Sequence, residues 1–249
     1  MKHPFTYIIS YRHRADRLMH LRRVLDWING FNGVEVIVVE QDKHSKIENL
    51  KLKCKHIFIK NDGVFNKSWS YNVAAKYAKS DLIVFGDCDL VMNPNDLVTA
   101  LNMMKDYDVI SPYNVVLDLQ QDESNFSIEN LLKITRPGRG EIDHQKINLT
   151  GGIALFRREA FFKIGGWCEF FTGWGGEDDF QTHKVHKLLK WTELKSKCFH
   201  FYHTRDNLNS DKYQQTLNLL NQLVNLSDDD LNRHIGSTFQ SLGLRNKYS

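Results

Sequence analysis

The first half of the chain alternates short apolar runs with stretches of helical periodicity. The apolar runs are rich in β-branched and aromatic residues, which predicts buried strands over residues 5–9, 34–39, 56–59, 82–85 and 107–110. Apolar residues at helical spacing between these runs predict helices over residues 18–28, 70–79 and 94–104. Gly30 ends the first helix, and Asn93-Pro94 has the N-cap and N1 chemistry that begins the third. The alternation predicts an α/β fold with a mostly parallel central sheet flanked by helices.

A polar segment over residues 119–148 interrupts this pattern and contains Pro137-Gly138-Arg139-Gly140. We interpret it as a long loop, because segments of this length without periodicity are usually lids or disordered. The chain then resumes with an apolar run over residues 152–156 and a short helix over residues 159–164. A Gly/Trp-rich turn at 173–177, a longer helix over 178–190 and a strand over 198–202 follow. Two terminal helices close the chain, and Ser227 caps the later one. We expect a single domain, since no repeat or linker divides the chain.

Composition excludes several classes of protein. The 33 basic and 30 acidic residues leave a net charge of +3, which argues against bulk binding of nucleic acid. The four cysteines are widely separated without CxxC spacing, so we expect reduced, mostly buried thiols rather than a zinc ribbon or disulfide framework. No apolar stretch approaches the roughly 20 residues of a transmembrane segment. The chain is therefore expected to be soluble and cytoplasmic.

Two carboxylates follow the predicted strand 82–85, in the segment Asp87-Cys88-Asp89. Open parallel sheets bind ligands beyond the carboxyl ends of their strands, and acids there can hold a divalent cation and contact a ribose. A lone Asp-x-Asp also arises by chance in a chain with this many acids, so the segment alone decides little.

The segment with the most candidate functional residues is Trp174-Gly175-Gly176-Glu177-Asp178-Asp179. The glycines allow close approach of the backbone, the indole offers a flat face for a sugar, and an Asp can take a proton from an attacking hydroxyl. The alternative is simple capping of a helix N-terminus by acids. Capping needs only one or two acids and does not explain Trp-Gly-Gly, which favours a sugar-binding floor with a catalytic base.

Two further pairs are candidates for the same site. His200 and His203 can both bind a metal only if the strand bends or ends there, since residues three apart in a strand face opposite sides. The alternative is one core histidine and one surface histidine. Arg12 and Arg14 follow the first strand and are placed to meet a diphosphate or order a nucleotide pocket, or else form a solvated pair at a helix start.

These segments, in this order, resemble the β-1,4-galactosyltransferase family and its relatives, which include bacterial chondroitin-type polymerases. Trp174 to Asp179 matches the family's Trp-Gly-Gly-Glu-Asp-Asp motif in full, and Ser10-Tyr11-Arg12-His13-Arg14 is similar to the end of its first strand. Phe65-Asn66-Lys67 with Asn72-Val73-Ala74, Gly151-Gly152 and His203-Thr204-Arg205-Asp206 also resemble family segments. The likeness runs from about residue 5 to residue 209.

The resemblance implies a GT-A fold, with a catalytic domain over residues 1–211 and a helical extension over residues 212–249 packed on it. It also implies an inverting, metal-dependent transfer of a hexose or N-acetylhexosamine from a UDP-sugar to a glycan or glycolipid acceptor, as in polysaccharide biosynthesis. Asp178 would be the base, because retaining relatives usually carry Asn there. The implied metal is Mn²⁺, held by Asp89, His203 and His200. The implied nucleotide-sugar contacts are Arg12, Arg14, Phe65 (stacked on the base), Asn72, Asp87, Leu149 and Gly152, and the acceptor contacts are Trp174, Glu177 and Asp179.

Three departures from the family pattern change this expectation. His200 stands where the animal enzymes carry Met, and a harder nitrogen ligand broadens metal use towards Mg²⁺. Leu149 stands where they carry Tyr, which leaves room for an N-acetyl group and makes UDP-GalNAc a plausible donor beside UDP-Gal. The N-terminal membrane anchor of the Golgi enzymes has no counterpart here, which points to a bacterial or viral cytoplasmic enzyme.

Two other classes of function stay open. A nucleotidyltransferase that makes NDP-sugars would use a similar sheet, although it normally shows a Gly-rich basic loop after the first strand. A non-catalytic carbohydrate-binding module would bind glycans without UDP or metal.

Overall fold

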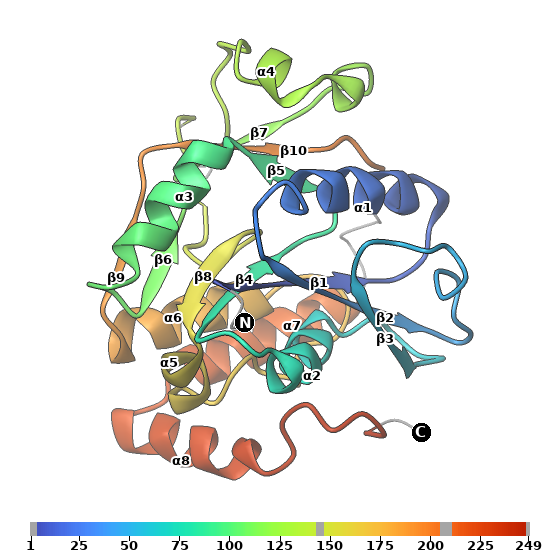
Figure 1. Ribbon diagram of the computed structural model, residues 1–249. Helices are drawn as coiled ribbons and strands as arrows, with labels where there is room; N and C mark the ends of the chain where they lie inside the picture. The colour runs from blue at the N-terminus through green and yellow to red at the C-terminus, as the bar shows by residue number, and fades with distance from the viewer. Residues whose placement is uncertain (1–3, 143–146, 205–210, 248–249) are drawn as a thin grey trace.

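A seven-stranded sheet forms the centre of the computed structural model, which describes residues 4–142, 147–204 and 211–247 (Figure 1). The strand order is β3-β2-β1-β4-β8-β6-β9. The strands are β1 Thr6–Tyr11, β2 Glu35–Asp42, β3 Lys55–Lys60, β4 Leu82–Gly86, β6 Val109–Ser111, β8 Ala154–Arg157 and β9 Trp191–Glu193. All pairs are parallel except those of β8, which runs antiparallel to β4 and β6. The predicted α/β fold with a mostly parallel sheet is confirmed.

A second, three-stranded sheet lies at the upper side of Figure 1, in the order β5-β10-β7. Its strands are β5 Leu90–Met92, β7 Val115–Asp118 and β10 Lys197–His200. The central strand β10 runs antiparallel to β5 and parallel to β7. Of these three strands the sequence predicted only β10, within residues 198–202.

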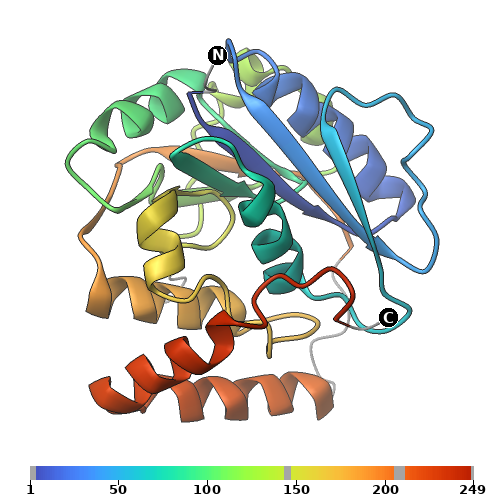
Figure 2. The same cartoon turned by 60° about the horizontal axis from the view of Figure 1, so that its bottom comes forward.

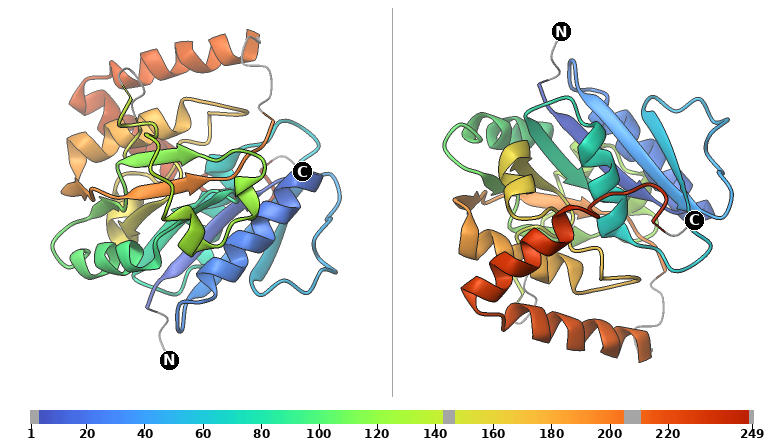
Figure 3. Two further views of the ribbon diagram at one scale, coloured as in Figure 1. Left: turned by 90° about the horizontal axis from the view of Figure 1, so that it is seen from above. Right: turned by 90° about the horizontal axis from the view of Figure 1, so that it is seen from below.

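The helices lie on both faces of the large sheet (Figures 1 and 2). α1 and α3 cover one face, α2, α5 and α6 cover the other, and α7 and α8 form a further layer beyond α6 (Figure 3). They are α1 Ala15–Ile28, α2 Lys67–Tyr77, α3 Pro94–Met103, α4 Ile128–Leu131, α5 Arg158–Lys163, α6 Glu177–Leu188, α7 Asp211–Val224 and α8 Asp228–Phe239. α2 begins three residues earlier than predicted, because the Asn66 side chain caps it by accepting from Trp69 N at 2.9 Å.

Alternate residues of the central strands enter two cores, one on each face of the sheet. In β1, Tyr7 and Ile9 pack on the α1 side, whereas Ile8 packs on the α2 side. A third cluster joins α6 to the terminal helices through Phe180, Leu223 and Leu231. Because α7 and α8 bury apolar side chains against α6, they are part of the same packed unit.

The segment after α8 returns to α2 on the lower side of the molecule (Figure 2). Trp69 Nε1 donates to Leu244 O at 2.7 Å, and Gly243 N donates to Glu169 Oε1 at 2.6 Å. The C-terminal residues therefore brace the helix that follows Phe65.

The segment predicted as one long loop, residues 119–148, contains regular structure among its described residues. Within it lie a 3-10 turn at Glu123–Asn125 and the single turn of α4. Arg139 forms an isolated antiparallel bridge with Val116. Residues 143–146 lie outside the described residues.

The four cysteines are free thiols, of which Cys54 is half-buried and the others are buried, as predicted. Among the helices in the described parts of the chain, none combines the length and the apolar character that crossing a bilayer requires.

We predict that Phe180→Ala lowers the free energy of unfolding by about 3–5 kcal/mol, the usual range for emptying a buried aromatic site. Phe180 is fully buried, and its ring centroid lies 6.1 Å from that of Phe171. Chemical denaturation followed by circular dichroism measures the loss. Phe239→Ala on α8 is the matched control, since Phe239 is 51% exposed and its removal should change stability by no more than about 0.5 kcal/mol. Similar losses for both variants would contradict this account of the third core.

Candidate active site

The loop after β4 carries Asp87, Cys88 and Asp89 at the carboxyl end of the large sheet. Asp87 N donates to Gly152 O at 3.2 Å, which places the Asp-x-Asp segment beside the residues that precede β8. Gly152 has a φ of +85°, and a methyl group there would lie 2.6 Å from Leu90 Cδ1 and would also strike the Tyr113 hydroxyl. A glycine is therefore required where the two segments meet.

The pairing of β10 with β5 brings the two histidines to Asp89. His200 is in register with Leu90, the residue after Asp89, and Phe201 N donates to Asp89 O at 2.9 Å. β10 ends at His200, so His203 lies beyond the strand and turns back towards it. The strand end that a pair of histidine ligands requires is therefore present.

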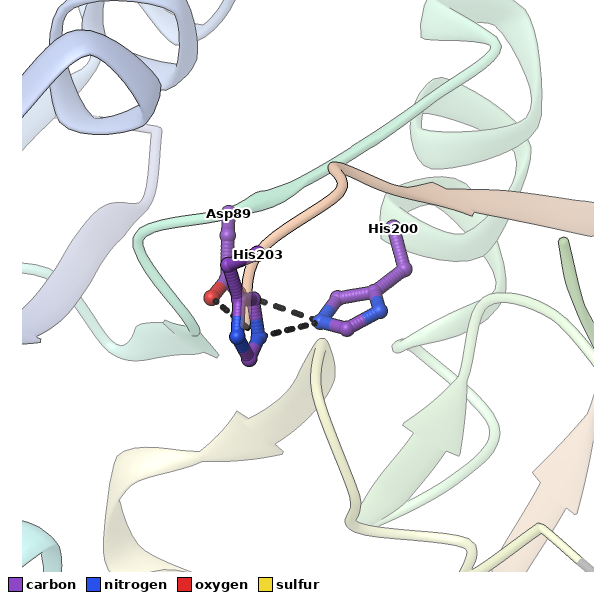
Figure 4. Close-up of side chains that lie close together, drawn as sticks. All are labelled: Asp89, His200 and His203. Carbon is purple, nitrogen blue, oxygen red and sulfur yellow. Dashed lines mark hydrogen bonds and ion pairs between the residues drawn. The ribbon is translucent and has the colours of Figure 1, made fainter. Parts of the chain in front are cut away.

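Asp89, His200 and His203 converge on one point (Figure 4). Their candidate ligand atoms all lie within 4.8 Å of one another. His203 Nε2 is 3.5 Å from Asp89 Oδ2, His200 Nε2 is 3.9 Å from Asp89 Oδ1, and the two Nε2 atoms are 3.2 Å apart. Asp89 and both histidines are largely shielded from solvent.

The hydrogen bonds on the far side of each ring indicate which nitrogen carries the proton. His200 Nδ1 faces Asp118 Oδ1 at 2.8 Å, and His203 Nδ1 faces Thr204 O at 3.0 Å. A carboxylate and a carbonyl only accept, so both Nδ1 atoms donate and both Nε2 lone pairs point into the cluster. Two lone pairs 3.2 Å apart beside a carboxylate repel unless a proton or a metal cation lies among them. The residues therefore fit a divalent cation that accepts nitrogen and oxygen ligands.

A second cluster lies around the ammonium of Lys67, the first residue of α2. Lys67 Nζ is 2.9 Å from Asp178 Oδ1, 3.0 Å from Glu177 Oε1 and 3.8 Å from Asp87 Oδ1. Tyr71, one turn further along α2, donates its hydroxyl hydrogen to Asp87 Oδ1 at 3.0 Å. One cation thus connects the Asp-x-Asp segment to the acids at the N-terminus of α6.

Burial and charge displace the protonation equilibria of this cluster. Burial raises the pKa of Asp178 to about 8; Lys67 opposes this rise, and the charges of Glu177 and Asp87 add to it. Burial also opposes the charged form of Lys67, but the surrounding acids raise its pKa well above the ordinary value. Lys67 is therefore a permanent cation, whereas Asp178 titrates near neutral pH.

The turn before α6 exposes the residues predicted to bind an acceptor. Trp174 is 61% exposed, and its ring centroid lies 5.5 Å from that of Tyr213 in α7. Gly176 has a φ of +82°, and a methyl group there would lie 2.6 Å from the Phe171 ring. Asp179 is exposed, whereas Glu177 is nearly buried.

The two arginines predicted to meet the diphosphate have different surroundings. Arg12 donates to the carbonyl oxygens of Gln41 (2.7 Å), Gly63 (2.7 Å) and Asn61 (3.1 Å), and its guanidinium lies 5.5 Å from the centroid of Phe65. It connects the end of β2 to the loop after β3 and contacts the Phe65 ring. Arg14 donates to Thr204 Oγ1 at 2.9 Å, beside the histidine segment.

Two other predicted nucleotide-sugar residues are buried. Asn72 is fully buried, and its side chain donates to Trp167 O and accepts from Trp167 N. This placement argues against direct contact with a nucleotide and indicates that Asn72 fixes the segment before the Trp-Gly-Gly turn. Leu149 is 5% exposed and packs in the core on the α2 side of the sheet.

The sequence reasoning missed several charged residues near the site. Lys67 was visible only as the third residue of Phe65-Asn66-Lys67, and no spacing pattern linked it to acids more than 100 positions away. Arg17 also faces the Asp-x-Asp segment, whose charges raise its pKa although burial opposes the rise. Arg205 and Asp206, quoted with His203, lie outside the described residues.

Comparison with known proteins identifies the class. Residues 18–165 match the model of glycosyl transferase family 2, and residues 141–206 match a model described as the N-terminal domain of galactosyltransferase. The first match covers more than half of the chain, which therefore belongs to glycosyl transferase family 2. The predicted resemblance to GT-A galactosyltransferases is confirmed by the two matches together.

Similar proteins agree with this class. β-1,4-Galactosyltransferase 4 of Cricetulus griseus is 35% identical over 78 residues, a segment that spans 29% of this chain and only 22% of that protein. The Drosophila β-1,4-galactosyltransferase 7 structure with manganese, UDP-Gal and xylobiose has a TM-score of 0.53 at 17% identity, covering 85% of this chain and 79% of that one. GalNAc-T7 with UDP, GalNAc and Mn²⁺ has a TM-score of 0.55 at 17% identity, covering 88% of this chain and 47% of that one. At these identities the two structures establish the GT-A fold alone.

We predict that Asp178→Asn flattens the pH dependence of stability. The folded pKa of about 8 exceeds the value of about 3.9 in an unfolded chain, so between these values the folded protein keeps a proton that the unfolded chain has released. The stabilisation is complete below about pH 4 and is lost as the pH rises through 8. The unfolding free energy of the wild type should therefore fall relative to that of the variant from pH 5 to pH 9. Denaturation at both pH values measures the two slopes, and equal slopes would show that Asp178 has an ordinary pKa.

Proposed function

We propose that this protein is an inverting, metal-dependent glycosyltransferase that moves a hexose or N-acetylhexosamine from a UDP-sugar to a glycan or glycolipid hydroxyl. The observation that carries the proposal is the pairing of two clusters beside Gly151 and Gly152. One is the Asp89–His200–His203 cation site, and the other is the carboxylate Asp178. The Drosophila structure with manganese and UDP-Gal, and GalNAc-T7 with UDP and Mn²⁺, support this choice of donor and metal.

In this proposal Asp89, His200 and His203 hold Mn²⁺, and the nitrogen ligands also suit other divalent ions such as Mg²⁺. The ion would neutralise charge that grows on the diphosphate as UDP departs. Arg14 and Arg17 add positive charge near the same segment. Phe65, supported by Arg12, offers a ring for stacking on the uracil.

Asp178 is suited to be the base because of its position. A methyl group on Gly151 would lie 3.5 Å from Asp178 Oδ2, so the carboxylate stands directly over the glycine pair proposed to border the donor sugar. Tyr113 fixes that pair by donating to Gly151 O and accepting from Ile153 N at 2.9 Å. Asp178 would take the proton of the acceptor hydroxyl as its oxygen attacks the anomeric carbon opposite departing UDP.

The acceptor face would be built on the exposed turn. Trp174 offers its indole for stacking, and Tyr213 extends the aromatic surface from α7. Asp179 is exposed, so its carboxylate would accept hydrogen bonds from sugar hydroxyls. Glu177 faces Lys67 instead, so its contribution would be to the charge of the site. Residues 1–211 would form the catalytic domain, with the helices of residues 212–249 completing this acceptor face.

We predict that Asp178→Asn lowers the turnover of sugar transfer by at least about 10²-fold, the lower end of what a positioned base contributes. Binding of the UDP-sugar, measured by calorimetry with Mn²⁺, should stay within a few-fold of the wild type because the amide keeps the shape of the side chain. Asp229→Asn, an exposed change on α8, is the control and should leave both quantities unaltered. Near wild-type turnover by the Asp178 variant would exclude it as the base.

A donor screen tests the function itself. We predict UDP release from UDP-GalNAc or UDP-Gal with Mn²⁺ and a glycan acceptor, and a shift of preference towards UDP-Gal in Leu149→Tyr, because the larger ring fills space for an N-acetyl group. Leu149 packs against the core, so the melting temperature of the variant must be measured alongside. An unchanged ratio of the two turnovers in a folded variant would remove Leu149 as the selector. Glycan binding without UDP release from any donor would favour a non-catalytic module.

A further inference from the structure

Asp118 lies at the opposite edge of the His200 ring from Asp89 and His203. β10 lies between β5 and β7, and the register pairs His200 with Leu90 on one side and with Asp118 on the other. Asp118 Oδ1 accepts from His200 Nδ1 at 2.8 Å. We propose that Asp118, anchored by Arg139, is a positioning residue that fixes the tautomer and orientation of His200 for metal binding. This inference rests on the proposed cation site, not on the identity of the sugar.

Arg139 holds the carboxylate from the segment that sequence periodicity described as a loop. Its Nε lies 2.9 Å from Asp118 Oδ2, and its Nη2 donates to Asp118 Oδ1 at 3.0 Å. The Arg139 backbone is fixed as well, since its N–H donates to Val116 O at 2.8 Å and its carbonyl accepts from Val116 N at 3.0 Å. The guanidinium is thus delivered by a segment that is itself bonded to β7.

The glycines on both sides explain how this segment approaches β7. A methyl group on Gly138 would lie 2.6 Å from Val116 O. Gly140 has a φ of +97°, and a methyl group there would clash with Asn114 O. Pro137-Gly138-Arg139-Gly140 therefore packs closely against β7 and places the Arg139 side chain beside Asp118. The sequence had indicated only a loop at this segment.

The position of Asp118 excludes it as a ligand of the same cation. The Nδ1 and Nε2 atoms lie at different edges of the ring, and Asp118 occupies the Nδ1 edge while Asp89 and His203 face Nε2. A carboxylate on the distal nitrogen of a metal-binding histidine orients the ring and strengthens the ligand.

The charges support this role. Arg139 contacts both oxygens of the Asp118 carboxylate, and His200 Nδ1 contacts one of them. A carboxylate oxygen accepts, so Nδ1 is the donor of this hydrogen bond. Arg139 balances the carboxylate so that the charge is not left unpaired behind the ring.

Titration of the purified protein with Mn²⁺, followed by the EPR signal of free Mn²⁺ with and without UDP, tests the inference. Asp118→Ala should weaken Mn²⁺ binding by about 10- to 100-fold, the usual effect of losing such a partner. Asp118→Asn should weaken it less, because the amide oxygen can still accept from Nδ1. Arg139→Gln should have a smaller effect of the same sign.

A double-mutant cycle separates positioning from general damage. If Asp118 acts through His200, then Asp118→Ala combined with His200→Ala should bind Mn²⁺ no more weakly than His200→Ala alone. Fully additive losses, or unchanged affinity in folded Asp118→Ala and Asp118→Asn, would overturn the inference.

Glu123→Gln is the matched control. Glu123 Oε2 accepts from Arg136 Nη2 at 2.6 Å, and Arg136 also donates to the backbone oxygen of Asp118, so this ion pair lies in the same segment without touching His200. Its removal should leave Mn²⁺ affinity within about twofold of the wild type. A loss as large as that of Asp118→Ala would mean that the segment acts through its fold rather than through the carboxylate.

Nitrogen-15 NMR of the metal-free protein gives a readout independent of the ion. His200 should carry its proton on Nδ1 in the wild type and lose this preference in Asp118→Ala; a proton on Nε2 in the wild type would overturn the inference. The same experiments distinguish failure of this inference from failure of the proposed function. Mn²⁺ binding that depends on Asp118, in a protein that releases no UDP from any donor, would keep the inference and refute the glycosyltransferase.

Discussion

The site depends on one buried cation, the ammonium of Lys67. Asp87, Glu177 and Asp178 all lie within 3.8 Å of it and come from two distant parts of the chain. Without Lys67, three carboxylates would share a poorly solvated space, and their repulsion would drive the loop after β4 away from the start of α6. An unpaired buried charge costs several kcal/mol of folding free energy, so the ion pairs stabilise both the acids and the lysine in this position. The ion pairs of a single lysine therefore link the Asp87 segment to the start of α6.

A second constraint is the register of β10. Side chains alternate between the two faces of a strand, so a slip of one residue would turn His200 away from Asp89 and Asp118 together. The register is maintained by the buried Cys198 and Phe199, which lie in the core with β5 and β7. The same hydrophobic contacts that stabilise the small sheet thus determine whether a cation site exists. Metal binding and folding are expected to be coupled for this reason.

Sequence periodicity predicted the long elements of the fold, whereas the candidate site residues came from residue types and from the resemblance to the galactosyltransferase family. The β-branched runs of β1, β2 and β4 are long enough to identify, and Asp87 and Asp89 follow the carboxyl end of β4 as predicted. Two strands of the small sheet, β5 and β7, escaped prediction, because pairing between distant short strands leaves no local pattern. The same limit applies to Lys67, whose partners are set by tertiary contacts. Asn72, which its motif suggested as a nucleotide-sugar contact, is buried, and its amide is bonded to Trp167 within the fold.

The strength of Asp178 as a base follows from two opposing effects of its surroundings. A carboxylate with an ordinary pKa near 4 is a weak base at neutral pH, whereas one buried without a counter-ion would keep its proton far above neutral pH. Burial moves the pKa of Asp178 upward and Lys67 moves it downward, and the balance lies at about 8. A base works best when its pKa lies near the pH at which it operates, because it is then available in the ionised form and still binds a proton well. In the proposed transfer, Lys67 would thus have two effects that cannot be separated, since the contact that holds the two halves of the site together also sets the basicity of Asp178.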